Sequence, residues 1–374
     1  MEAPVARVRL PNGTEAWQIS RYRDARAALS DRRLSRAAAA GAHLGTSTLF
    51  GPSMLTSDPP AHTRLRRVLS AAFTARSIER LRPRVQGIVD QLVQRLAAAG
   101  GAVDLVEGLA IPLPLTMIGE LLGVSPEHRE RLRAWTPSMH TIPTTDEERW
   151  RLTFQAQRLT RFVERLVAGR RAVTAGEPDL LSTLTAAAGA GHLSHAELVG
   201  TVSLLLFAGH ETVVSFIGNA VLALLRHPAE LGTLRSRPEL LPAAVDELLR
   251  YDGPFQRTAL RVATEDVEIA GTAIRAGDAV VVAIGAADRD PERYPDPDRV
   301  ELRGRRGDSL AFGHGVHSCL GAHLARLESQ VAIGTLIARF PDLCLACPAE
   351  EVRRGPRSVF VRGVHALPVL LAGG

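Results

Sequence analysis

One long apolar segment, at residues 198–225, carries a charged residue at its centre. As a helix, LVGTVSLLLFAGHETVVSFIGNAVLALL is long enough to cross a bilayer. Glu211 lies near its middle, and a glutamate at the centre of a membrane costs several kcal/mol. Ser194 and Glu197 have the spacing of a capping box, which marks the start of a helix. We therefore expect one continuous helix over 194–226, buried in the core of a large soluble domain.

The polar residues inside this helix leave two interpretations open. A buried glutamate needs a partner, water or a role in proton transfer. Thr212 can donate its hydroxyl hydrogen to the carbonyl of Ala208, and next to Gly209 this bond would loosen or bend the helix. Glu211 therefore either moves protons in a reaction or forms a satisfied salt bridge at a kink.

Helical periodicity dominates the rest of the chain. The expected helices are 21–30, 60–73, 76–98, 111–122, 126–138, 147–173, 228–235, 237–250 and 320–339. Two strands are expected at the N-terminus, joined in a hairpin around Asn12 and Gly13, and more within 258–283. No repeat or linker divides the chain. We predict a single domain over 1–374, mainly α with a minor β-sheet (α+β).

The segment 41–60 is rich in Gly, Ser, Thr and Pro. It is too long for an ordinary connection between helices. We expect a lid or a binding loop there.

Charge and cysteine content argue against several classes of protein. All 45 basic residues are arginine and are spread along the chain, so the net charge of +5 gives no basic patch for nucleic acid. Three cysteines do not suit a disulfide framework. Cys344 and Cys347 form a CxxC without further zinc ligands nearby, which favours plain packing. With no signal peptide visible, we expect a cytoplasmic protein that binds neither nucleic acid nor membrane.

The segment FGHGVHSCLG, at residues 312–321, gathers candidate metal ligands. A zinc site would use four side chains, His314, His317, Cys319 and His323. That interpretation leaves Gly313, Gly315 and Gly321 unexplained, whereas a backbone lying against a flat group needs them. A helix starting near Leu320 would place Cys319 at its N-terminus, where a thiolate is stabilised. A single cysteine ligand to haem iron is favoured.

Two further charged arrays are visible. Glu247 and Arg250 are three residues apart and share a helix face, which alone is a weak signal. His62 and Arg66 are four apart and could hold a carboxylate or phosphate.

FGHGVHSCLG resembles the haem-binding signature of the cytochromes P450, and four other segments agree in order and spacing. AGHET at 208–212 is similar to the oxygen-activating helix motif of that family, and ELLR at 247–250 to its ExxR pair. YPDPDRV at 294–300 resembles the segment that supplies the third member of that pair, Arg299, with Tyr294 replacing a usual phenylalanine. HTRLR at 62–66 resembles its propionate-binding HxxxR.

The resemblance implies a cytochrome P450 fold, with haem b between the long central helix and the helix after the cysteine loop. Cys319 would be the axial thiolate ligand. Glu211 and Thr212 would be the catalytic residues of oxygen activation. The remaining cofactor contacts would be His62, Arg66, Arg261, Phe312 and His317.

The resemblance also implies an activity. The chain would be a monooxygenase that hydroxylates or epoxidises a small molecule with O2, as soluble bacterial members do on polyketides, macrolides or peptides. Electrons would come from a ferredoxin and a ferredoxin reductase, with Arg64, Arg67 and Arg326 as a docking surface on a monomer. Oxidative coupling, a peroxide-driven enzyme and a haem sensor without catalysis stay as alternatives.

Overall fold

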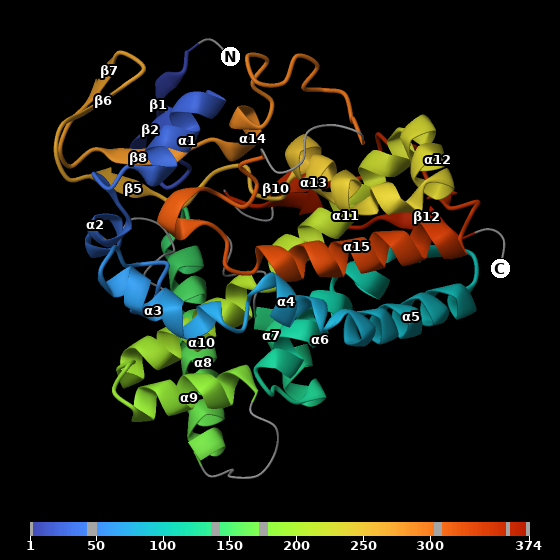
Figure 1. The fold of residues 1–374 in the computed structure, drawn as a ribbon, viewed down its shortest axis with the longest axis horizontal. Coiled ribbons are helices and arrows are strands. Elements are labelled where there is room, and N and C mark those ends of the chain that lie inside the picture. The colour runs from blue at the N-terminus through green and yellow to red at the C-terminus, as the bar shows by residue number, and fades with distance from the viewer. Residues whose placement is uncertain are drawn as a thin grey trace.

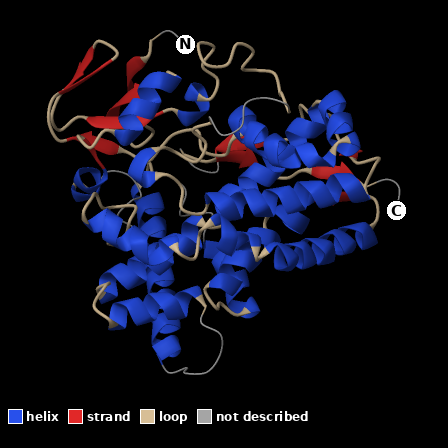
Figure 2. Ribbon diagram, viewed as in Figure 1, coloured by secondary structure: helices blue, strands red, loops and turns tan. Residues whose placement is uncertain are grey.

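The computed structural model describes residues 3–42, 51–135, 143–171, 179–302, 309–356 and 360–371. Within them the chain forms a large helical body with a small sheet at one end (Figures 1 and 2). The predicted class, mainly α with a minor sheet, is confirmed.

The helices follow the chain as α1 Tyr22–Ser30, α2 Arg36–Gly41, α3 Ala61–Ser70, α4 Ala75–Glu79, α5 Arg82–Ala99, α6 Pro112–Leu121, α7 Pro126–Trp135, α8 Asp146–Arg171, α9 Leu180–Gly189, α10 His195–Ala208, α11 Glu211–Arg226, α12 Pro228–Ser236, α13 Leu241–Asp252, α14 Ile284–Ala287 and α15 Ala322–Arg339. Within the described residues the chain also forms three short helical turns, η2 Val106–Ala110, η4 Pro238–Leu240 and η5 Gly315–His317.

The strands are β1 Val5–Arg9, β2 Glu15–Ile19, β3 Leu34–Ser35, β4 Ala102–Asp104, β5 Arg261–Ala263, β6 Val267–Ile269, β7 Thr272–Ile274, β8 Ala279–Val282, β9 Cys344–Leu345, β10 Arg354–Pro356, β11 Arg362–Val364 and β12 Pro368–Leu370. The largest sheet has the order β1-β2-β8-β5-β3, in which only β2 and β8 are parallel. The predicted N-terminal hairpin is confirmed, with Gly13 at φ +84° in its turn.

Helix α11 is the centre of the helical body. Every residue from Val213 to Leu224 is buried, so the helix is packed on all sides. It packs against α13, α15, η2 and β11. Helices α5 and α15 lie side by side at the edge of this body (Figure 1).

The predicted continuous helix over 194–226 is wrong: the chain breaks at Gly209 and His210 into α10 and α11. The capping box of Ser194 and Glu197 is confirmed at the start of α10. The expected bend therefore becomes a full interruption. Together α10 and α11 are long and apolar enough to cross a membrane, but 78% of the most apolar window is buried inside the protein. That burial fits a core element.

Other boundaries also differ from the sequence prediction. The single helix expected over 76–98 is two helices, α4 and α5, and Pro83 lies in the first turn of α5. Helices α2, α9 and α14 were not predicted. Of the proposed lid, residues 43–50 lie outside the described residues.

Replacing Gly209 by alanine tests the break between α10 and α11. A Cβ at Gly209 would lie 2.6 Å from the carbonyl oxygen of Leu205 and 2.9 Å from Cγ1 of Ile118. We expect Gly209→Ala to lower the free energy of unfolding by about 1–3 kcal/mol, because neighbouring atoms must shift. Gly232→Ala in α12 is the control, since its Cβ meets no atom within 4 Å, and it should stabilise by up to about 1 kcal/mol. Equal denaturant midpoints for the two variants would contradict this account.

Candidate functional site

The cysteine loop is closed by its own backbone. The amide of Cys319 donates to the carbonyl of Phe312 at 2.8 Å. Gly313 and Gly315 have φ of +69° and +73°, which only glycine adopts readily. A Cβ at Gly315 would also lie 2.9 Å from the carbonyl oxygen of Leu29 in α1. Turn geometry and packing on α1 thus account for these two glycines, which the sequence analysis had assigned to a flat group.

Two opposing effects act on the ionisation of the Cys319 thiol. Although Cys319 is reachable by solvent, the dense protein around it raises the pKa of its thiol, and this effect prevails. The amide of Gly321, which caps α15, bonds to the sulfur, and the charges of Arg66 and Arg326 act in the same direction. These three groups would stabilise a thiolate once an electrophilic partner is bound.

Phe312 lies under a guanidinium on the same side of the loop. The Arg326 carbon Cζ is 4.4 Å from the centre of the Phe312 ring. Arg326 is itself held by Asp246 in α13, with Nε 2.6 Å from Oδ1. This stack holds the side chain of Phe312, whose backbone carbonyl accepts the hydrogen bond from the Cys319 amide.

The zinc alternative finds no support in the geometry. Across the described parts of the chain, no three or more His, Cys, Asp or Glu side chains are grouped closely enough to hold a metal ion. Cys344 and Cys347 are both free thiols.

A cluster of basic side chains lies beside the cysteine thiol. It is formed by the buried His62 of α3 and Arg261 of β5 and by the half-buried His317, and the rings of the two histidines are 4.4 Å apart. The fourth predicted member, Arg66, acts on His62 through its charge but forms its hydrogen bonds with the loop. Its guanidinium donates to the carbonyls of Ser318 at 2.7 Å and Val316 at 3.2 Å, so it holds the loop itself.

The cluster contains one residue that the sequence analysis missed. Arg36, the first residue of α2, is 5% exposed, and nothing in the sequence distinguishes it from the other arginines. Its charge acts on Arg261, and burial lowers the pKa of Arg36 to about 9. Burial likewise lowers the pKa of Arg261 and of His62.

Several buried nitrogen atoms of this cluster have no hydrogen-bond partner within the described residues. They are His62 Nδ1, His317 Nε2, Arg261 Nε and Arg36 Nη2. Buried polar groups are nearly always paired, so this set indicates an acidic ligand group. Two carboxylates on one flat molecule, as on haem, fit this donor set.

One carboxylate, also missed from the sequence, lies next to the cluster. Asp58 accepts from the Ser35 hydroxyl at 2.5 Å and from the amides of Arg36 and Ala37 at 3.2 and 3.1 Å. Burial alone would raise the pKa of Asp58, but these hydrogen bonds hold that pKa below its ordinary value. Asp58 Oδ1 is 3.5 Å from His317 Nε2, too long for a good hydrogen bond.

The two predicted catalytic residues lie at the break between α10 and α11. Glu211 begins α11 and is 4% exposed. Thr212 Oγ1 is 3.4 Å from the carbonyl oxygen of Ala208, as the sequence analysis expected, but the bond is long. Next to them, His210 Nδ1 lies 3.0 Å from the carbonyl oxygen of Leu206.

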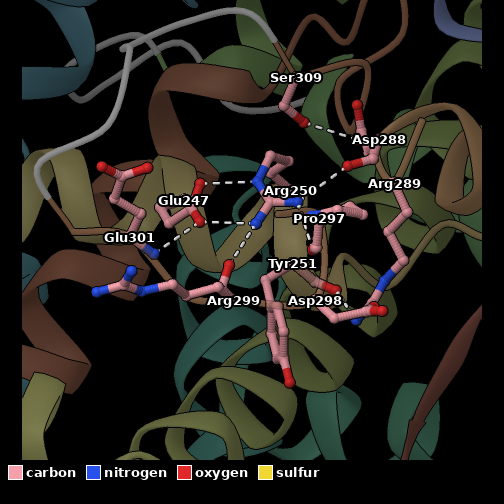
Figure 3. Close-up of polar contacts among 10 residues, drawn as sticks. All are labelled: Glu247, Arg250, Tyr251, Asp288, Arg289, Pro297, Asp298, Arg299, Glu301 and Ser309. Atoms are coloured by element: carbon pink, nitrogen blue, oxygen red, sulfur yellow. Dashed lines mark hydrogen bonds and ion pairs between the residues drawn. The ribbon is translucent and has the colours of Figure 1, made fainter. Parts of the chain in front are cut away.

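Arg250 is the centre of a buried network behind the loop (Figure 3). It forms a two-bond ion pair with Glu247 at 2.8 and 2.7 Å. It also donates to the carbonyls of Asp288, Pro297 and Arg299. The predicted role of Arg299 needs correction, because its carbonyl takes part while its guanidinium points away (Figure 3).

Comparison with known proteins decides the family. The family model described as Cytochrome P450 matches residues 115–345. The cytochrome P450 monooxygenase PikC of Streptomyces venezuelae is 44% identical, over 98% of this chain and 88% of its own. The chain belongs to the cytochrome P450 family. It is a monooxygenase, and its family carries a haem-thiolate cofactor.

Two further relatives show the range of this P450 group. The mycinamicin IV hydroxylase/epoxidase of Micromonospora griseorubida is 40% identical, over 98% of this chain and 92% of its own. The solved cytochrome P450 enzyme CxnD, for C–S bond formation in chuangxinmycin biosynthesis, matches with a TM-score of 0.90 and 37% identity, over 99% of this chain and 91% of its own.

The arginines expected to dock a redox partner differ in their surroundings in this P450. Arg64 is paired with Glu197 at 2.5 Å, and Arg326 is paired with Asp246. Arg67 is exposed on α3. The surface is therefore less cationic than the sequence alone suggests.

Asp288, in the network of Figure 3, predicts a pH dependence of stability. Burial raises the pKa of Asp288 to about 7, although it accepts bonds from Leu310 N and Ser309 Oγ and faces Arg250. Between about pH 4 and 7 the folded protein therefore holds a proton that the unfolded chain releases, so stability falls as the pH rises.

Asp288→Asn removes this titration and can keep both hydrogen bonds. Its free energy of unfolding relative to the parent should increase by roughly 2–4 kcal/mol between pH 4 and 7. Denaturant unfolding at both pH values measures this difference, in which contributions from other groups cancel. A difference that does not change with pH would show that Asp288 is ionised throughout.

Proposed function

We propose that this P450 binds haem b through Cys319 and uses O2 to hydroxylate or epoxidise a small molecule of the macrolide or polyketide type. The observation that carries the proposal is the pairing of a backbone-closed cysteine loop with a cluster of basic side chains beside it. A sulfur ligand and basic nitrogen atoms without partners are what the iron and the propionates of haem require. The hydroxylase and epoxidase activities of the relatives support the reaction class.

Each cofactor residue would have a distinct task. Cys319 would give its sulfur to the iron, with the Gly321 amide bonded to that sulfur. His62, Arg261 and His317 would donate to the propionates. Arg66 would act indirectly, because its guanidinium holds the carbonyls of the loop. Phe312 would shield the sulfur under Arg326.

When bound, the haem supplies the iron at which O2 is activated. The protein must deliver protons to the oxygen at the right moment. Thr212 suits this task because its bond to Ala208 is long and easily exchanged for one to a ligand. Glu211, next in the chain and almost fully buried, would return protons to the Thr212 hydroxyl.

The electron donors would be a ferredoxin and a ferredoxin reductase. Members of this family use separate redox partners, and an acidic ferredoxin would meet the exposed Arg67 of α3 and the half-exposed Arg64. Three free cysteines support a reducing compartment, the cytoplasm. We also infer that the enzyme acts as a monomer.

Oxidative bond formation is a second candidate, favoured by the similarity to CxnD. The mass of the product distinguishes the two reactions. Oxygen insertion adds one oxygen atom, whereas coupling removes two hydrogen atoms.

Replacing Cys319 by serine tests the thiolate assignment. The reduced, carbon-monoxide-bound parent should show the red-shifted Soret band of thiolate-ligated haem, and Cys319→Ser should lose it. Cys344→Ser is the matched control and should keep the band, because Cys344 lies in β9 outside the loop. A normal band in Cys319→Ser would refute the proposed ligand.

Replacing Thr212 by alanine tests the proton route. We expect product formed per electron pair to fall by roughly ten-fold or more, because positioned proton transfer contributes at least this much. Thr212→Ser keeps a hydroxyl and should retain most of the coupling. Product and reductant are measured together with a substrate found by its spin-state shift. Unchanged coupling in Thr212→Ala would exclude the hydroxyl from proton delivery.

A further inference from the structure

We propose that Arg36 is an additional propionate ligand of the haem, acting opposite Arg261 on the same carboxylate group. This inference rests on the proposed function, since it requires haem in the site. It adds a residue that the family motifs in this sequence do not predict.

The pairing of β3 with β5 brings the two arginines together. Strands β3 and β5 are antiparallel, with Leu34 opposite Ala263 and Ser35 opposite Val262. Arg36 follows Ser35 as the first residue of α2, and α2 packs against β5. The charge of Arg261 acts on that of Arg36, and like charges so placed repel. The guanidinium of Arg261 also donates to the carbonyl of Leu34 at 3.2 Å, which holds this side chain against β3.

Both side chains are buried in spite of this repulsion. Arg36 is 5% exposed and Arg261 4% exposed. Each keeps a buried nitrogen, Nη2 and Nε respectively, that has no partner within the described residues. Two adjacent buried cations are stable only if negative charge compensates them.

The carboxylates of the protein supply only part of that charge. Asp58 acts on both Arg36 and Arg261, so its single negative charge balances one of the two positive charges. Its oxygens are occupied by the Ser35 hydroxyl and by the backbone amides of Arg36 and Ala37. Asp31, which acts on Arg261, forms a two-bond pair with Arg33. Further negative charge must come from a ligand.

The positive charge of Arg36 also acts on both His62 and His317, the residues matched to the propionate site by motif. If Arg36 served only as the partner of Asp58, its side chain would bond to that carboxylate. Within the described residues, Asp58 instead accepts from the Arg36 amide at 3.2 Å, and Nη2 of the guanidinium has no partner and is available to a propionate.

Transfer of haem to apomyoglobin tests this role without measuring catalysis. The parent and Arg36→Met are reconstituted with haem and, separately, with haem dimethyl ester, whose propionates carry no charge. We expect Arg36→Met to lose haem about ten-fold faster or more, because a hydrogen bond to a charged group is removed. With the ester, the parent and the variant should lose the cofactor at the same rate.

Two further variants distinguish the loss of a haem ligand from a folding defect. Arg36→Lys keeps the charge without the planar fork, and we expect a smaller acceleration that also disappears with the ester. Arg32→Met, at an exposed position on the same segment, should behave as the parent. Faster loss of both cofactors to the same extent would assign Arg36 a structural role, and unchanged loss of haem would exclude it as a ligand. Either result would overturn the inference while leaving the Cys319 spectrum, and so the proposed function, intact.

Discussion

The ion pair between Glu247 and Arg250 holds together the part of the protein on which the site is built. A buried guanidinium is tolerable only when its donors are satisfied, and Arg250 meets this condition with one carboxylate and three carbonyls. The carbonyl of Asp288 is one of these, and the side chain of Asp288 in turn accepts from Leu310 N and Ser309 Oγ. Two residues further on, Phe312 accepts from the Cys319 amide. The position of the Cys319 sulfur therefore depends on α13 through this series of contacts.

The basic side chains around the site form two groups. The buried Arg250 and the half-buried Arg66 donate to protein oxygen atoms, which is the pattern of residues that stabilise a fold. Arg36, Arg261 and His62 keep buried nitrogen atoms without partners among the described residues. Since leaving such atoms unpaired costs free energy in the folded protein, the second group indicates a ligand. Burial alone does not separate the groups, whereas hydrogen bonding does.

Local patterns in the sequence predicted the local features of the fold. The hairpin around Gly13 and the capping box at Ser194 depend on residues close in sequence, and both are confirmed. The bend near Gly209 was expected, but not that it would end one helix and begin another. Motifs identified the cysteine loop and the Glu247–Arg250 pair. Arg36 and Asp58 could not be found in this way, since only the pairing of β3 with β5 and the capping of α2 bring them to the cluster.

The interruption at Gly209 and His210 divides one apolar segment between two sets of neighbours. Helix α10 packs mainly on α8 and α9, whereas α11 packs on α13 and α15 (Figure 1). A continuous helix would transmit a shift of α10 directly to α11. Because the helix is interrupted, substitutions in α8 and α9 can move α10 while α11 keeps its contacts with α13 and α15. The two halves of the apolar segment can therefore change independently among related proteins.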